Sequence, residues 1–450
     1  MNNSKGLSMF QIGIFIACAA GIVFAILIFS GKIPLGETKT TQTLKGSVAI
    51  WGTLPGDSVR AMTDQLRQTY KDVNFSYSQK KLETFQLDLV NALASGVGPD
   101  LVFISPAEVI QNKDRLLEIP YASLPQATFQ NAFIDQGSLF LTSTGVLGLP
   151  FVVDPLVMFY NRDLIAGSFT VNPPKTWDEL IALNKKVTVK DDAGKLVTET
   201  TALGTFDNIT HAKEIISAII FQTGNKIVAW DPYTKKYVSK FSQADSAGNS
   251  GVANALSFYT AFANVNDADR YSWNGSLPKD KDQFIAGKLA TYFGYASELE
   301  GIRQKNPNLN FEVSVFPQRS QGVLKATYGK MTALAVIKVS KNVPLAIAMA
   351  QQMTSKDAVT QYLAYESTVI PARRDMVTLD SEDAHKTLFY KSAIIAQGLL
   401  DPDQTQTTAL FKKFIDQINS GIAQPGAILS PGDSLLSGIL QKAQRDVTTQ

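Results

Sequence analysis

The sequence predicts an α/β protein with a mostly parallel sheet, preceded by one transmembrane helix. Three observations lead to this fold class: alternating strand-like and helix-like segments after residue 46, a length of 450 residues, and an apolar run near the N-terminus. A chain of this length should hold two or three domains. Its 45% hydrophobic and 10% aromatic residues can build sizeable cores, which excludes a disordered or fibrous chain.

The apolar run near the N-terminus spans Met9–Phe29, 21 residues without a charge. That length can cross about 30 Å of hydrocarbon. Lys5 and the amino terminus favour a cytoplasmic N-tail, which leaves the bulk of the chain outside. The run is longer than the core of a cleaved signal peptide, and no A-x-A site follows it closely. We therefore expect an uncleaved anchor over residues 9–30 and a polar linker over residues 31–44.

The single cysteine, Cys18, leaves two alternatives to the anchor open. Phe15-Ile16-Ala17-Cys18 loosely resembles a bacterial lipoprotein box, although Phe15 stands where leucine is usual and apolar residues continue for eleven positions beyond the cysteine. Simple secretion after cleavage is the other alternative. The rest of the chain has no cysteine, so a disulfide framework, a cysteine-ligated metal and cysteine catalysis are excluded there.

The segments after the linker alternate between strand and helix patterns. Short apolar or alternating runs are typical of strands, and apolar residues three or four positions apart are typical of helices. The order strand, helix, strand, helix, strand favours a mostly parallel sheet with helices on both faces. These segments are Ser47–Trp51, Ser58–Tyr70, Val73–Tyr77, Phe85–Leu93 and Leu101–Ile104.

Similar patterns continue along the chain. Thr176 and Glu179 form a capping box that should start a helix, and two hairpin-like stretches turn at acidic residues. The C-terminal third is helical in pattern and is interrupted by prolines. Beyond the capping box the expected elements are hairpins at Val187–Thr198 and Lys226–Ser239, helices at Gly251–Asn264 and Lys279–Gly287, and strands at Ala290–Phe293, Phe311–Phe316 and Met331–Val339.

Charge and motif content exclude several classes of function. A net charge of +2 gives no electrostatic footprint for nucleic acid, so no nucleic-acid partner is expected. The only two histidines, His211 and His385, lie far apart, and neither a metal-spaced cluster nor a nucleotide-binding loop occurs. We therefore expect no cofactor and no metal. Gly432-Asp433-Ser434-Leu435 spells the GDSL of a hydrolase family, but no histidine follows it, and a helix start with Asp433 near the cap is the better interpretation.

Five motifs, in order, carry a resemblance to a known family. In chain order they are the G-x-x-P-D-hydrophobic step at Gly96–Val102, the Asp154-Pro155 strand and capped helix within Gly148–Leu180, F-x-x-G-K-x-A at Phe284–Thr291, Tyr328-Gly329 with Ser340-Lys341-Asn342, and P-x-R-R at Pro371–Arg374. Together they resemble the extracellular solute-binding proteins of ABC importers, family 1, the maltose-binding-protein-like group. Thr291 departs from the methionine usual in the third motif. The matches run from about residue 47 to residue 375.

The resemblance implies a periplasmic-binding-protein-like (type II) fold, with two α/β lobes joined by a hinge. Mapped onto this chain, the first lobe comprises residues 45–152 and 318–367, and the second comprises residues 153–317 and 368–450. The resemblance also implies a monomer that binds a sugar or oligosaccharide between the lobes. It would deliver this solute by hinge closure to the permease subunits and their ATPase. No bond is made or broken by such a chain, so it is not expected to be an enzyme.

Binding a sugar requires aromatic faces for C–H surfaces and polar groups for hydroxyls. Trp51 and Ser105 follow strand ends, where ligands meet open α/β sheets. Tyr295 stands where the resemblance implies a stacking aromatic, and Asp154 stands at the hinge crossing. The alternatives are core packing for Trp51, a hinge-cap role for Asp154 and a surface ion pair for Arg373. The complete set of candidate ligand-binding residues is Trp51, Ser105, Asp154, Trp230, Trp273, Tyr295, Tyr328 and Arg373.

Two other functions remain open from the sequence. A tethered ligand sensor on the same fold would pass occupancy to a signalling partner instead of a permease. A surface hydrolase would require turnover that disappears in Ser434→Ala, and none is expected.

Overall fold

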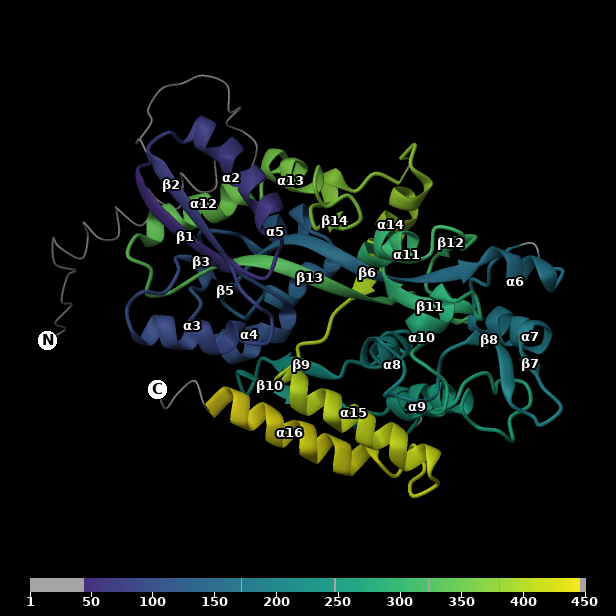
Figure 1. The fold of residues 1–450 in the computed structure, drawn as a ribbon. Helices are drawn as coiled ribbons and strands as arrows, with labels where there is room; N and C mark the ends of the chain where they lie inside the picture. The colour runs from purple at the N-terminus through teal and green to yellow at the C-terminus, as the bar shows by residue number, and fades with distance from the viewer. Residues whose placement is uncertain (1–43, 171, 247, 323, 380, 446–450) are drawn as a thin grey trace, which may run out of the picture.

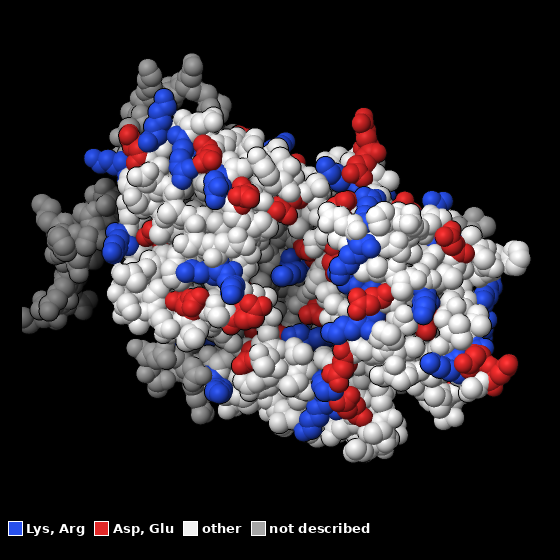
Figure 2. All heavy atoms as spheres, viewed as in Figure 1, with Lys and Arg blue, Asp and Glu red and all other residues white. Residues whose placement is uncertain are grey.

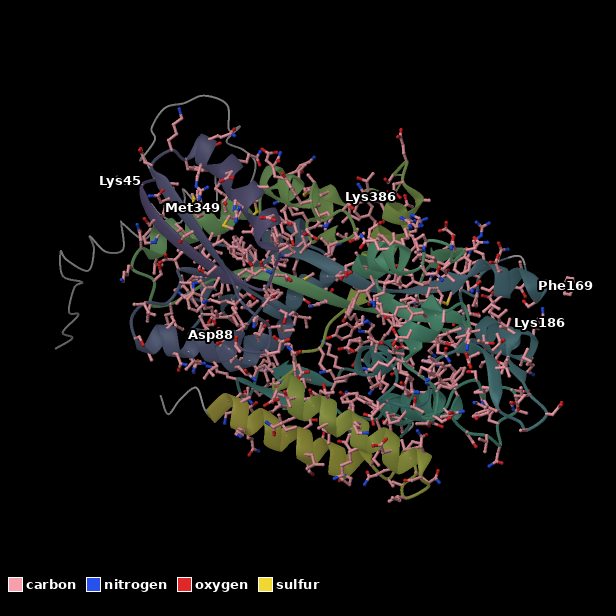
Figure 3. The ribbon with its side chains drawn as sticks, viewed as in Figure 1. Lys45, Asp88, Phe169, Lys186, Met349 and Lys386 are labelled. Carbon is pink, nitrogen blue, oxygen red and sulfur yellow. The ribbon has the colours of Figure 1, made fainter. Side chains whose placement is uncertain are left out.

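A computed structural model describes residues 44–170, 172–246, 248–322, 324–379 and 381–445 (Figure 1). The expected anchor at residues 9–30, Cys18, and the expected linker up to residue 43 lie outside the described residues. Within the described ranges, no helix is both long and apolar enough to cross a membrane. Lys45 and Phe169 lie at opposite ends of the molecule (Figure 3).

One mixed sheet runs through the whole molecule. Its strand order is β2-β1-β3-β13-β6-β11-β8-β7. The bounds are β1 Gly46–Gly52, β2 Val73–Gln79, β3 Leu101–Ile104, β6 Leu149–Asn161, β7 Val189–Lys190, β8 Leu196–Thr201, β11 Leu289–Tyr295 and β13 Thr327–Val336. Strands β1 to β3 are the first half of the sheet, and β7, β8 and β11 are the second half.

The expectation of a mostly parallel sheet is correct for β2-β1-β3 and for β11-β8, but not for the middle of the sheet or for the end strand β7, which is antiparallel to β8. Strand β1 is parallel to β2 and β3, and β11 is parallel to β8. The two longest strands, β6 and β13, are antiparallel to each other and to their neighbours β11 and β3. These two strands carry the chain from one half to the other without an intervening helix. The sequence pattern did not show this.

Strand β6 joins the two halves. Its first part, up to Pro155, pairs with β13, and its second part, from Leu156 onward, pairs with β11. Asp154 and Pro155 lie where the strand passes from one half to the other, and both strands cross the middle of the molecule in Figure 1. The side chains of Val153 and Leu156 are fully buried, so this crossing belongs to the core.

Helices flank each half of the sheet. In the first half, the apolar stripe predicted for Ser58–Tyr70 is confirmed, because Val59, Met62 and Leu66 of α2 are buried. Helix α2 packs on β2 and α13. The helices of this half are α2 Gly56–Thr69, α3 Phe85–Ala94, α4 Pro106–Asn112, α5 Gln126–Ala132, η1 Asp135–Phe140, α12 Val343–Met353 and α13 Lys356–Leu363.

The capping box at Thr176 is confirmed: its hydroxyl accepts from the backbone N–H of Glu179, and the Glu179 carboxylate accepts from the backbone N–H of Thr176. The other helices are α6 Arg162–Gly167, α7 Trp177–Val187, α8 Ala212–Phe221, α9 Gly251–Ala261, α10 Asp280–Ile285, η2 Ala296–Glu298, α11 Leu299–Lys305, η3 Arg374–Met376, α14 Ala384–Ile394, α15 Gln404–Asn419 and α16 Leu429–Arg445. Helices α15 and α16 lie side by side along the lower edge in Figure 1, and α16 contacts both β10 and α4.

Several short strands complete the fold. The hairpin predicted at Lys226–Ser239 is confirmed as β9 Val228–Asp231 and β10 Lys236–Ser239. The pair β7–β8 confirms the other hairpin. The remaining strands are β4 Ile119–Pro120, β5 Gly145–Val146, β12 Phe311–Ser314, β14 Ile370–Pro371 and β15 Ala396–Gln397.

Candidate functional site

The junction between the halves is hollowed, and Lys, Arg, Asp and Glu side chains gather along it (Figure 2). Asp154 lies in this junction at the crossing of β6, opposite Lys330 of β13. Its carboxylate accepts from the Ser297 hydroxyl at 2.5 Å and from the Ser297 backbone N–H at 3.1 Å. Burial raises the pKa of Asp154 to about 6, although these hydrogen bonds and Lys330 act in the opposite direction.

Tyr295 ends β11 next to this crossing. It pairs with Leu156, two residues after Asp154. Its ring meets the His211 ring edge to face, with centroids 4.8 Å apart and planes at 74°. Its backbone N–H donates to Glu298 at 2.8 Å. The aromatic ring is therefore held from two sides, by a strand end and by a histidine of the loop before α8.

Glu298 binds four groups of the second half. One carboxylate oxygen bonds His211 Nε2 at 2.6 Å and the Tyr295 N–H. The other accepts from the Tyr292 hydroxyl at 2.8 Å and forms a short ion pair with Lys281. Burial alone would raise the pKa of Glu298, but the hydrogen bonds and charges of His211 and Lys281 lower it to about 2. Glu298 is thus an ionised, structurally fixed carboxylate beside Tyr295.

Tyr328 lies on the same side of the junction, at the start of β13. Its ring stacks on Phe221 of α8, with centroids 6.4 Å apart and planes at 14°. The neighbouring Thr327 hydroxyl donates to the Leu156 carbonyl at 2.7 Å, which ties β13 to the crossing of β6. We call Asp154, His211, Tyr295, Glu298 and Tyr328 the junction cluster.

Two predicted residues come from the first half of the sheet, at the edge where β1 and β3 end. Trp51 and Ser105 lie at the carboxyl ends of β1 and β3, and these strands are paired through Trp51 and Val102. The Lys80 ammonium covers the Trp51 ring at 3.7 Å from its centroid. Ser105 is the N-cap of α4 in a capping box with Glu108: its backbone N–H and its hydroxyl both donate to the Glu108 carboxylate, at 2.5 and 2.6 Å.

Two predicted residues lie away from the junction. The expectation that Trp273 lines a cleft is wrong for this structure, because its side chain is 0% exposed in the core. The backbone N–H groups of Ser272 and Trp273 both donate to the Phe262 carbonyl at the end of α9, which turns the indole inward. Arg373 makes a two-point ion pair with Asp375 at 2.8 Å, so the surface-pairing alternative is the one observed.

Trp230 lines a separate cavity of about 360 Å³, which we call the hairpin cavity. Its walls come from η1, from the β9–β10 hairpin and from residues 396–400. Gln136, Phe221, Trp230, Tyr237 and Leu399 are among its lining residues. Phe221 also carries the stacked Tyr328, so this cavity lies close to the junction cluster.

The GDSL segment has a structural role. Asp433 and Ser434 lie inside α16, in its second turn, and not at a helix start as expected. The Ser434 hydroxyl donates to the Ser430 carbonyl at 3.0 Å, and Asp433 accepts from Ser239 of β10 at 2.6 Å. Within the described ranges, no group of three His, Cys, Asp or Glu side chains could hold a metal ion.

His211, Glu298 and Lys330 were missed as site residues. His211 was treated as an isolated histidine, and Glu298 and Lys330 belong to no motif. His211 and Glu298 are separated by 87 positions, and their hydrogen bond joins the start of α8 to η2. Lys330 follows the Tyr328-Gly329 motif, but it lies opposite Asp154 only through the antiparallel register of β13 and β6, which the sequence pattern did not show.

Comparison with known proteins identifies the class. The chain belongs to the family of bacterial extracellular solute-binding proteins, whose model matches residues 61–389. The predicted resemblance is thereby confirmed. A protein of Brucella abortus strain 2308 described as a binding protein is 22% identical over 366 residues, covering 79% of this chain and 82% of the relative.

Solved structures share the fold. The cyclic alpha-maltosyl-1,6-maltose binding protein from Arthrobacter globiformis has a TM-score of 0.71 and 18% identity, over 88% of this chain and 100% of that chain. The sugar-binding protein MalE from Xanthomonas citri has a TM-score of 0.71 and 16% identity, over 90% and 100%. An ABC transporter solute-binding protein from Thermotoga lettingae, bound with alpha-D-tagatose, has a TM-score of 0.62 and 20% identity, over 88% and 100%. The fold is therefore that of two-lobed α/β solute-binding proteins.

Proposed function

We propose that this protein binds a sugar or oligosaccharide at the junction cluster and delivers it to an ABC permease by hinge closure. The observation that carries this proposal is the meeting of Asp154, Tyr295 and Tyr328 where β6 and β13 pass between the halves. The family is extracellular, and three proteins of the same fold bind sugars by name or in their structures.

The chemistry of the junction suits a sugar. A pyranose ring presents apolar C–H faces that stack on aromatic rings and hydroxyls that need placed polar groups. Tyr295 and Tyr328 supply the rings, and Asp154 supplies two acceptor oxygens. Trp51 supplies a further ring from the first half of the sheet, at the same edge. A solute in this position would contact both halves.

The connections between the halves support the proposal of hinge closure. Two long strands cross the junction, and a small rotation at Asp154-Pro155 and Gly329 would move one half against the other. A ligand that contacts both halves favours the closed arrangement by its additional contacts there. We retain the lobe boundaries 45–152 with 318–367, and 153–317 with 368–450, for this movement.

The membrane anchor, the monomeric state and the permease partner belong to the same proposal. Residues 9–30 would hold the protein at the outer face of the membrane as a single-pass anchor. The protein would act as a monomer and receive no help from a cofactor. Its partners would be the permease subunits and their ATPase, which hydrolyses the ATP.

A thermal-shift screen of the full chain, in a detergent without a sugar headgroup, tests the proposal. A ligand that binds only the native state raises the unfolding midpoint. We expect at least one of maltose, maltotriose, glucose or tagatose to raise it, and Tyr295→Ala to weaken that binding by roughly 1–2 kcal/mol. Tyr233→Ala is the matched control, because Tyr233 is 94% exposed on the hairpin turn. A shift with amino acids, polyamines or metal ions alone would show that the sugar assignment is wrong.

A further inference from the structure

The hairpin cavity has the size of a small-ligand site. Its volume of about 360 Å³ lies at the small end of the range of about 300–1,000 Å³ found for ligand pockets. Its walls come from segments more than 250 residues apart, since η1 begins at Asp135 and the last segment ends at Leu400. The cavity is therefore a product of the tertiary fold and not a surface irregularity of one loop.

Three lining residues carry buried polar atoms without a hydrogen-bond partner. These atoms are Oε1 of Gln136, Nε1 of Trp230 and the hydroxyl of Tyr237. Gln136 and Tyr237 are only 4% and 3% exposed. Nine side-chain atoms of this kind occur in the described part of the chain, and three of them belong to residues that line this one cavity. An unpaired buried polar group costs free energy that a suitable partner recovers.

The Gln136 amide has a fixed orientation. Its Nε2 donates to the Gly329 carbonyl at 2.5 Å, and a carbonyl can only accept, so Oε1 is left as a free acceptor. Two glycines make room for this amide. A Cβ atom at Gly329 would lie 2.5 Å from Oε1, and one at Gly398 would lie 2.7 Å from Nε2. The acceptor is therefore held in place by the backbone around it.

The two donors come from one rigid hairpin. Trp230 and Tyr237 are cross-strand partners, and their rings meet edge to face with centroids 5.1 Å apart. Gln444 of α16 bonds both the N–H and the carbonyl of Tyr237, at 2.9 and 3.1 Å. The Lys113 ammonium lies 3.9 Å from the centre of the Trp230 ring. These contacts fix the indole and the phenol before any ligand arrives.

We propose that the hairpin cavity is a second ligand site, for a neutral hydroxylated molecule of one or two small rings. A hydroxyl group both donates and accepts, so it can serve Gln136 as well as Trp230 and Tyr237. Among the described residues that line the cavity, the charged ones are Asp135 and Lys226, and their opposite signs favour a neutral ligand. Apolar lining residues such as Leu139 and Leu399 suit the C–H faces of a ring.

A ligand at this site would also act on the junction. Gln136 is bonded to Gly329, which pairs with Pro155 at the crossing of β6. The other two proposed contacts, Trp230 and Tyr237, belong to the β9–β10 hairpin, which follows the crossing of β6 in the chain. A bound molecule would therefore stabilise the present arrangement of the halves and change affinity at the junction cluster. By linkage, a junction ligand would change affinity at the cavity by the same factor.

Equilibrium dialysis of the full chain, in a detergent without a sugar headgroup, tests the second site. The probes are labelled glucose, maltose and myo-inositol. The background variant is Asp154→Asn with Tyr295→Ala, which removes the junction contacts. We expect at least one probe to bind this background. Adding Trp230→Phe and Tyr237→Phe should then weaken the binding about tenfold, because two neutral hydrogen bonds are lost while an aromatic ring remains at each position.

Two results would overturn the second site. One is that no probe binds the background variant. The other is an affinity that stays within about twofold after the two phenylalanine substitutions. Tyr237→Phe removes only a hydroxyl that has no partner, whereas Trp230→Phe also shortens the ring system, so the unfolding midpoint of each single variant is measured as a control for folding. Failure of the sugar assignment at the junction gives a different pattern, in which the wild type and the background bind the probes equally.

Discussion

His211 and Glu298 form a hydrogen bond of 2.6 Å between Nε2 and a carboxylate oxygen, directly behind the Tyr295 ring. The pair is largely buried, with side chains 16% and 12% exposed. The same carboxylate accepts from the Tyr295 backbone, and Ser297 beside it donates to Asp154. One short turn, η2, therefore links the buried ion pair to both proposed ligand contacts.

Replacing Glu298 by Gln should destabilise the protein by on the order of 3 kcal/mol at pH 7, because His211 and Lys281 would lose their shared charged partner. The effect should depend on pH. The pKa of Glu298 is lowered from 4.5 to about 2, so its contribution is present above about pH 4.5 and is lost as the pH falls toward 2. Urea unfolding of both proteins at several pH values measures this. A difference that does not shrink in acid would contradict it.

His211 should titrate above the ordinary histidine value. Burial alone would lower its pKa, but the hydrogen bond and charge of Glu298 raise it. Its stabilising effect is therefore complete below about pH 6.5 and is lost as the pH rises through the folded pKa. Histidine NMR measures this pKa cleanly, because the chain has only two histidines and His385→Gln assigns them. In Glu298→Gln the His211 pKa should fall; an unchanged value would show that the pair is not coupled.

Affinity for a sugar should decrease as the pH falls through about 6. Burial raises the pKa of Asp154 to about 6, and protonation removes one of its acceptor sites for hydroxyl groups. Asp154→Asn should bind more weakly at pH 7.5 and show little of this pH dependence. Calorimetric titration between pH 5 and 8 compares the two proteins. Equal pH profiles would place the titrating group elsewhere.

In the ligand-free protein, the protonation of Asp154 that weakens sugar affinity should instead increase the stability of the fold. A raised folded pKa means that the folded state binds the proton more tightly than the unfolded state does. The stability of the wild type relative to Asp154→Asn should therefore increase as the pH falls from about 7 toward 4. The two experiments on Asp154 together separate its role in folding from its role in binding.

The sequence predicted those features that depend on local patterns or on the family motifs. The α2 stripe, the Thr176 capping box and the Lys226–Ser239 hairpin are local, and the structure contains all three. Tyr295 was placed by its motif. The Trp273 prediction is wrong because whether a loop aromatic points into a core or a cleft depends on distant backbone groups, here the Phe262 carbonyl. His211 and Gln136 were missed as binding groups because their partners, Glu298 and Gly329, are 87 and 193 positions away.

Gly329→Ala and Gly438→Ala should change stability in opposite directions. A Cβ at Gly329 would lie 2.5 Å from Gln136 Oε1 and 2.7 Å from the Ala396 Cβ. The glutamine end could move, but the Ala396 Cβ is fixed by the pairing of β15 with β13, so the strand must shift. We expect Gly329→Ala to cost about 1–3 kcal/mol. A Cβ at Gly438 meets nothing within 4 Å in the middle of α16, so alanine there should add about 0.5–1 kcal/mol of stability.

The double substitution Gly329→Ala with Ala396→Gly separates crowding from other effects at Gly329. Removing the Ala396 Cβ relieves the contact at 2.7 Å, so a large part of the lost stability should return. Urea midpoints of the single and double variants measure this coupling. Purely additive effects would mean that Gln136 or Val153, and not Ala396, limits the space at the crossing. In that case Gly329→Ala should also disturb the Gln136 amide, because the new methyl group would displace the bond that fixes it.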